Sequence, residues 1–171
     1  IGAIYIADQV DITPILHGAD HERGVRAGTE NTPFIVGLGR ASRLAAQRIL
    51  GAEEPSRLRD RLWACLQSEL GDAVQTKSIL DACLPNTLSV RFSNVLGYQL
   101  LADVPEICAS TGAACHSGSV ATSATLRAMN VPAESAAGTV RLSTGMFTTE
   151  EEIDRAANGL VEAYRRVISR G

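Results

Sequence analysis

The chain has 171 residues, of which 45% are hydrophobic and 20% charged, and it carries a formal net charge of −3. This length and apolar content predict one soluble globular domain, or one domain and a piece, and the acidic balance argues against nucleic acid or an anionic membrane as a partner. No apolar run approaches the length of a membrane span. The four cysteines form no Cys-x-x-Cys pair, so the sequence indicates neither a metal site nor a disulfide framework and favours a reducing cytoplasm.

The first fifty residues combine an apolar run with a polar loop. Residues 1–7 predict a buried strand, and the absence of an initial Met or a signal-peptide layout indicates the latter part of a longer protein. Residues 17–31 have no periodicity and are rich in Gly and charge, which predicts a functional loop. An anion such as phosphate would seek Arg23, Arg26 and the Thr29 hydroxyl, although a solvated loop with internal ion pairs explains the same residues.

Two helices are predicted next. Thr32 and Pro33 form a helix-start signal, and helical spacing of apolar residues continues to about Gly51. A second helix runs from about Glu54 to Leu70 and places Cys65 on its apolar stripe.

Short strands and helices then alternate. A strand is expected at Thr87–Phe92 after an irregular connection, a brief helix at Leu96–Leu101, and a strand at Glu106–Ser110 in which Cys108 points inward. A helix at Ser123–Met129, a strand at Thr139–Ser143 and a capping box at Thr149–Glu152 before the last helix follow. This order predicts an α/β fold in which helices pack on a small mixed or antiparallel sheet.

Cys115 stands among small, flexible residues. Gly112 and Gly118 bracket it, and hydroxyl side chains surround it, so a loop could carry the thiol to a substrate. The adjacent His116 gives weak support for a thiolate. A buried structural cysteine is the alternative that local composition leaves open.

Arg141 interrupts an apolar strand. A guanidinium in such a place must be paired with a carboxylate of the protein or of a ligand, and its position fits a bidentate carboxylate clamp. An outward-facing side chain in an alternating strand is the other interpretation.

Three motifs together carry a family resemblance: Gly28-Thr29-Glu30-Asn31, residues 109–119 around Cys115 (the Cys115 segment), and Val140-Arg141-Leu142-Ser143-Thr144-Gly145. In their order and rough spacing the chain resembles the cysteine desulfurase and selenocysteine lyase (NifS-like) family, which are pyridoxal-phosphate enzymes of the class V aminotransferase type. The resemblance implies that residues 1–50 are the tail of the large cofactor domain and that residues 51–171 are the smaller C-terminal domain.

The resemblance also implies roles for single residues. Cys115 would take sulfur from L-cysteine, leaving L-alanine and a persulfide on Cys115, and Arg141 would hold the substrate's α-carboxylate. Thr29 would contact the phosphate of pyridoxal phosphate in the partner subunit of a homodimer. The family has glycines where this chain has Ala19 and Asp20, and neither His17 nor His21 is assigned a role.

The family's Schiff-base lysine lies just ahead of the opening strand, and Lys77, the single lysine here, stands in a polar stretch that reads as surface. The isolated chain is therefore expected to be inactive. Two alternatives stay open beside the desulfurase: a selenocysteine lyase acting on L-selenocysteine, and a non-enzymatic truncated or sulfur-accepting module. The identity of a sulfur-acceptor protein is not encoded in these motifs.

Overall fold

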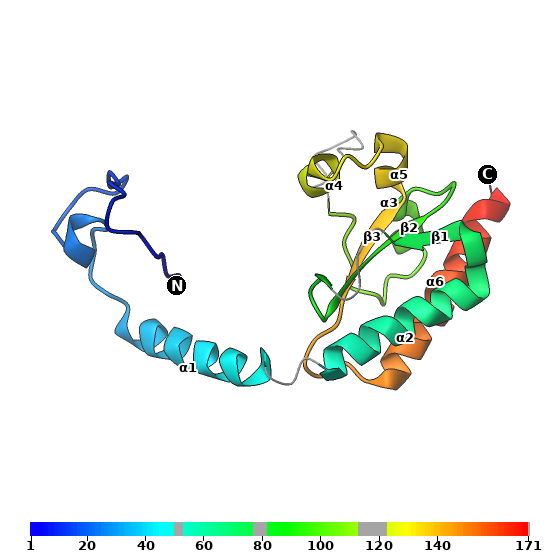
Figure 1. The fold of residues 1–171 in the computed structure, drawn as a ribbon, viewed down its shortest axis with the longest axis horizontal. Coiled ribbons are helices and arrows are strands. Elements are labelled where there is room, and N and C mark those ends of the chain that lie inside the picture. The colour runs from blue at the N-terminus through cyan, green and yellow to red at the C-terminus, as the bar shows by residue number, and fades with distance from the viewer. Residues whose placement is uncertain (50–52, 77–81, 113–122, 171) are drawn as a thin grey trace. The chain divides into compact units, whose positions relative to one another are not determined.

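A computed structural model describes residues 1–49, 53–76, 82–112 and 123–170 (Figure 1). The chain divides into two compact units, Ile1–Gly51 and Ala52–Gly171, each with its own architecture. Lys77, Cys115 and His116 lie outside the described residues.

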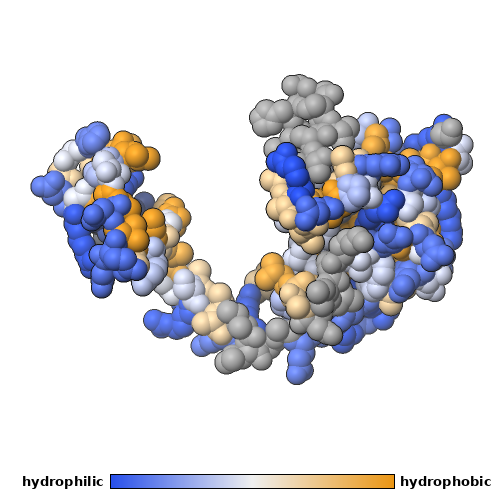
Figure 2. Space-filling view, turned by 45° about the horizontal axis from the view of Figure 1, so that its top comes forward, coloured by the Kyte–Doolittle hydropathy of each residue, from blue (hydrophilic) through white to orange (hydrophobic). Residues whose placement is uncertain are grey.

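The first unit contains an extended segment, a loop and one helix. The prediction of a buried strand at residues 1–7 is wrong: none of these residues is in a strand, and Ile1, Ile4 and Tyr5 are between 70% and 91% exposed. A strand needs a neighbour for its backbone hydrogen bonds, and none of the described residues pairs with this run. Apolar side chains accordingly lie at the surface of this unit (Figure 2).

Helix α1 (Thr32–Ile49) begins close to its predicted start, but a different residue caps it. The backbone N–H of Phe34 donates to Asn31 Oδ1 at 3.2 Å, so Asn31 rather than Thr32 satisfies a free donor of the first turn. Pro33 lies in that turn, where its missing N–H has no cost.

The second unit is built on a three-stranded antiparallel sheet in the order β1-β2-β3. Strands β2 (Thr87–Phe92) and β3 (Thr139–Ser143) have the predicted bounds, while β1 (Val74–Thr76) falls in the connection that was expected to be irregular. The α/β prediction is confirmed in this form, as helices with a small antiparallel sheet.

Two long helices, α2 (Glu53–Leu70) and α6 (Glu150–Arg170), contact one another and cover one face of the sheet (Figure 1). The short helix α3 (Gly97–Ala102) packs on α6. The inward side chains of the strands meet the apolar faces of these helices, which is the hydrophobic core of the unit. Its largest fully buried side chains are Leu66, Leu88, Val90, Phe92, Leu100, Val104, Val140 and Leu160.

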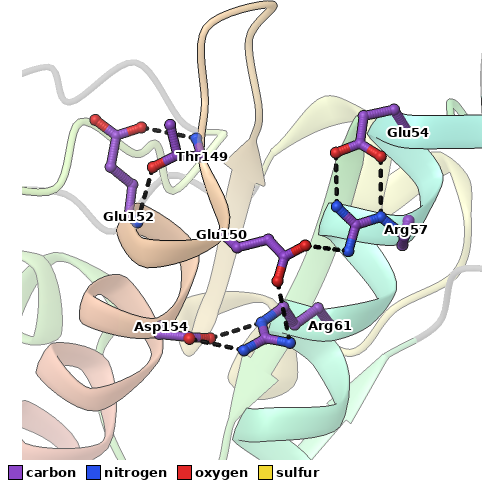
Figure 3. A network of polar contacts seen from close by, with 7 residues as sticks. All are labelled: Glu54, Arg57, Arg61, Thr149, Glu150, Glu152 and Asp154. Carbon is purple, nitrogen blue, oxygen red and sulfur yellow. Dashed lines mark hydrogen bonds and ion pairs between the residues drawn. The ribbon is translucent and has the colours of Figure 1, made fainter.

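A network of ion pairs joins the N-terminal turns of α2 and α6 (Figure 3). Arg61 donates two 2.7 Å hydrogen bonds to Asp154, and Arg57 links Glu54 to Glu150. The predicted capping box begins α6, since the N–H of Thr149 donates to Glu152 Oε2 and the N–H of Glu152 donates to Thr149 Oγ1.

The remaining described elements are two five-residue helices, α4 (Ala124–Ala128) and α5 (Ala133–Ala137), and two short 3-10 helices, η1 (Glu22–Gly24) and η2 (Gly71–Ala73). The strand expected at Glu106–Ser110 is reduced to a single bridge at Ser110, and Cys108 is exposed rather than inward-facing. Among the described residues, no helix combines the length and the hydropathy that crossing a membrane requires.

Candidate functional site

Arg141 lies at the centre of β3 and points away from the core. Its neighbours Val140 and Leu142 are buried, whereas Arg141 is exposed, as the alternation of a one-sided sheet requires. Within the described residues its guanidinium forms no ion pair. Of the two partners that the sequence left open, a carboxylate of the protein is not found among the described residues, so pairing with a ligand's carboxylate stays a prediction.

Ser110 pairs with Arg141 on the outer edge of β3. The N–H of Arg141 donates to the Ser110 carbonyl at 2.7 Å, and the N–H of Ser110 donates to the Arg141 carbonyl at 3.2 Å. Ser110 Oγ also accepts a hydrogen bond from the N–H of Gly112, whose φ of 72° favours glycine. Cys115 follows shortly after this turn and lies outside the described residues. Ser110, near the start of the Cys115 segment, is thus hydrogen-bonded to the strand that carries Arg141.

Ser89 faces Arg141 from the other side, on β2. Because both backbone polar groups of Arg141 point toward Ser110, Ser89 and Arg141 form a non-hydrogen-bonded pair, the kind in which facing side chains lie closest. Two hydroxyl-bearing residues thus pair with Arg141, Ser89 on one side of β3 and Ser110 on the other. This donor set suits a carboxylate.

Gly97 brings α3 close to β3 and to Thr111. A Cβ at Gly97 would lie 3.1 Å from Thr111 Cγ2, 3.1 Å from the Thr139 carbonyl oxygen and 3.2 Å from Val140 Cγ2. These distances are tighter than ordinary contact, so glycine lets the helix pack on β3 and on the residue after Ser110.

An open hollow of about 460 Å³ lies beside the sheet, where β2 ends. Arg91 of β2 and Glu134 of α5 both line it without forming an ion pair with each other. The other lining residues are Phe92, Asn94, Val95, Leu96, Gln99, Ala133 and Ala137.

Thr29 belongs to the loop of the first unit. Its side chain is exposed, and no described residue bonds to its hydroxyl. The preceding Gly28 has a φ of 100°, and a Cβ there would lie 2.9 Å from Arg26 Nη1. A free hydroxyl, a guanidinium and a backbone that only glycine allows fit the phosphate of pyridoxal phosphate. The same loop strains Glu22 and Arg23, both with positive φ.

The described histidines and the other cysteines have different surroundings. His17 is exposed, and His21 is half-buried with no hydrogen-bond partner for its buried Nδ1. Cys65 packs against the core, as expected from its place on α2. Cys83 accepts a hydrogen bond from the buried Arg59 at 3.3 Å, and the pKa of Arg59 is raised chiefly by its hydrogen bond to Asp60.

The sequence motifs identify Arg141, but they do not place Ser89, Ser110 or Arg91 on its side of the sheet. The alternation of Thr87–Phe92 was a sufficient signal that Ser89 and Arg91 share the polar face. No pattern in the sequence indicated that Ser110 would pair with Arg141, because the two residues are far apart in the chain and only the register joins them.

Comparisons with known proteins agree on one family. The model of the family described as "Aminotransferase class-V" matches residues 2–156. A cysteine desulfurase of Nostoc sp. is 41% identical over 98% of this chain, and one of Gluconacetobacter diazotrophicus is 43% identical over 98%. The chain spans 42% and 43% of the length of these two relatives.

Solved structures give the same result. A protein described as "NIFS-LIKE PROTEIN" superposes with a TM-score of 0.79 at 34% identity, covering 95% of this chain and 41% of that protein. A NifS-like protein from Rickettsia africae superposes with a TM-score of 0.76 at 30% identity, covering 91% of this chain and 41% of that protein.

Proposed function

The chain belongs to the aminotransferase class-V family, in the group of cysteine desulfurases and NifS-like proteins, and we propose that it supplies the substrate-binding and sulfur-accepting residues of a cysteine desulfurase. The family uses pyridoxal phosphate. Cysteine rather than selenocysteine is the proposed substrate, because the similar curated relatives are described as cysteine desulfurases.

The proposal rests on the surroundings of Arg141. Its exposed guanidinium has no carboxylate partner among the described residues, and Ser110, near the start of the Cys115 segment, is hydrogen-bonded to its backbone. In this proposal Arg141 holds the α-carboxylate of L-cysteine with two parallel hydrogen bonds. Fixing the carboxylate limits where the substrate sulfur can lie, which gives Cys115 a defined target.

Bound pyridoxal phosphate supplies an electron sink next to the substrate's α-carbon. Thr29 donates a hydrogen bond to the cofactor phosphate, in the proposed homodimer to that of the partner subunit. The Cys115 thiolate forms a bond to the substrate sulfur while the carbon–sulfur bond breaks. The electron pair of that bond stays with carbon, which takes up a proton to give L-alanine, and the sulfur remains as a persulfide on Cys115.

Transfer of label from L-cysteine tests the proposal. A protein that carries this chain together with the family's Schiff-base lysine segment is incubated with pyridoxal phosphate and sulfur-labelled L-cysteine, denatured without reductant, and digested. Label is expected on the Cys115 peptide, and dithiothreitol should release it as sulfide. Cys115→Ala should abolish the label, whereas Cys108→Ala, the same change at an exposed cysteine of the described residues, should retain it. Full labelling or turnover in Cys115→Ala contradicts the proposal.

The same assay tests Arg141. Arg141→Gln removes a charge-assisted carboxylate contact, so the L-cysteine concentration for half-maximal labelling should rise at least about tenfold. Arg155→Gln removes an exposed arginine of α6 that forms no ion pair among the described residues and should leave that concentration unchanged. A parallel arm with L-selenocysteine tests the lyase alternative: a stronger response to that substrate favours it.

A further inference from the structure

The start of the Cys115 segment is attached to two elements of the second unit. Ser110 forms two backbone hydrogen bonds with Arg141 of β3, at 2.7 and 3.2 Å. Thr111, the next residue, lies against α3, since a Cβ at Gly97 would be 3.1 Å from Thr111 Cγ2. Two consecutive residues thus hold the chain beside the strand that carries Arg141.

The Ser110 side chain holds the turn that follows. Its Oγ accepts a 3.0 Å hydrogen bond from the N–H of Gly112, whose φ is 72°. Glycine can adopt many backbone conformations, and this hydrogen bond favours one of them. The hydroxyl has no part in the backbone pairing with Arg141, so a substitution can remove the turn contact and leave the pairing in place.

The two described residues that flank positions 113–122 are neighbours. A Cβ at Gly112 would lie 3.5 Å from Cβ and from Oγ of Ser123, the residue that precedes α4. Both ends of the stretch that contains Cys115 are therefore held at one place. The rate of a reaction between two held groups depends steeply on how they are placed, so the direction of the chain at Gly112 matters for a thiol carried beyond it.

We propose that Ser110 is a positioning residue of the sulfur transfer. Its backbone pairs with Arg141 and its hydroxyl holds the Gly112 turn, so one residue links the substrate-binding strand to the direction in which the Cys115 segment leaves it. This inference rests on the proposed function, in which Arg141 binds the carboxylate of L-cysteine and Cys115 takes its sulfur. Ser110 acts through the turn and is assigned no contact with the substrate.

Single-turnover labelling tests this role. The protein of the transfer assay, which carries this chain and the lysine segment, is mixed with pyridoxal phosphate and sulfur-labelled L-cysteine at several concentrations, and the rate of labelling of Cys115 is followed. Ser110→Ala loses one hydrogen bond, so the rate at saturating L-cysteine should fall at least about threefold. The concentration for the half-maximal rate should stay within about twofold, because the Arg141 guanidinium is unchanged.

Two further variants distinguish positioning from a general loss of stability. Ser110→Thr keeps a hydroxyl and should label within about twofold of the wild-type rate. Ser169→Ala removes a comparable exposed contact, the 2.8 Å hydrogen bond from Ser169 Oγ to the Arg166 carbonyl on α6, and should change neither quantity.

The outcomes separate this proposal from the proposed function. An unchanged saturating rate in Ser110→Ala, or a lowered rate that Ser110→Thr does not restore, overturns the role of Ser110. A rise in the half-maximal concentration alone also overturns it, because Ser110 would then act in substrate binding. In each of these cases the proposed function stands if Cys115→Ala still abolishes the label, whereas label retained in Cys115→Ala overturns both.

Discussion

Gly138 joins α5 to β3 at a point where no side chain fits. A Cβ there would lie 2.3 Å from the Phe92 carbonyl oxygen and 2.9 Å from that of Val95, and both are backbone atoms. The Phe92 backbone cannot move away freely, because its N–H donates to the Gly138 carbonyl at 2.9 Å. Gly138→Ala should therefore lower the free energy of unfolding by about 3 kcal/mol, measured by urea unfolding with the fluorescence of Trp63.

Gly159→Ala is the matched control. A Cβ at Gly159 would lie 3.6 Å from Val104 Cγ1 and 3.7 Å from Glu106 Oε1, which are ordinary contacts. Since Gly159 is inside α6, alanine should raise the free energy of unfolding by about 0.5–1 kcal/mol. Equal effects of the two substitutions would show that the close approach at Gly138 is not the cause.

At the scale of elements, the contact between α2 and α6 should depend on pH. Hydrogen bonds from Arg61 lower the pKa of Asp154, and those from Arg57 lower the pKa of Glu54. A carboxyl whose pKa is lower in the folded state stabilises the fold above its unfolded pKa, about 4, and this contribution is lost as the pH falls through the folded value. The free energy of unfolding should fall as the pH is lowered below about 4.

Arg61→Gln separates this effect from general acid denaturation. The variant loses the partner that lowers the pKa of Asp154, so its free energy of unfolding should change less than that of the wild type between about pH 5 and pH 2.5. Arg155→Gln should keep the wild-type dependence. Urea unfolding at several pH values measures all three, and parallel curves for Arg61→Gln and the wild type would contradict the assignment.

Elements with a strong local pattern were predictable. Both the strict alternation of Thr87–Phe92 and the reciprocal cap of Thr149 and Glu152 depend only on residues close together in the chain. The structure contains both. Val74–Thr76 has only three residues, too few to show a period, and the five-residue α5 has the same difficulty. Residues 1–7 have a strand's composition, but composition does not provide the partner that a strand needs.

The chemical groups of the candidate site could be predicted from the sequence, but their arrangement in space could not. The outward position of Arg141 follows from the alternation of β3, which was one of the two interpretations that the sequence left open. Its place beside Ser89 and Ser110 depends on the pairing of segments that are distant in the chain. Motifs identify groups one by one, whereas the sheet register decides which of them can touch the same ligand.

At the scale of the molecule, the two units should differ in local stability. No described residue of the first unit is buried, whereas α6 alone has five buried residues. An 18-residue helix such as α1 is marginal in water without packing. Amide hydrogen exchange of the chain should therefore be fast throughout α1 and slowest in β2 and α6. Protection in α1 equal to that in α6 would contradict this expectation.

The pairing of Ser110 with Arg141 also bears on self-association. An exposed edge strand can associate with other chains, because its free N–H and C=O groups can form hydrogen bonds with a further strand. At Arg141 both groups are already engaged by Ser110, so a foreign strand finds neither donor nor acceptor there. The protein thereby keeps an exposed arginine on a strand without leaving the backbone at that position open to pairing with another chain.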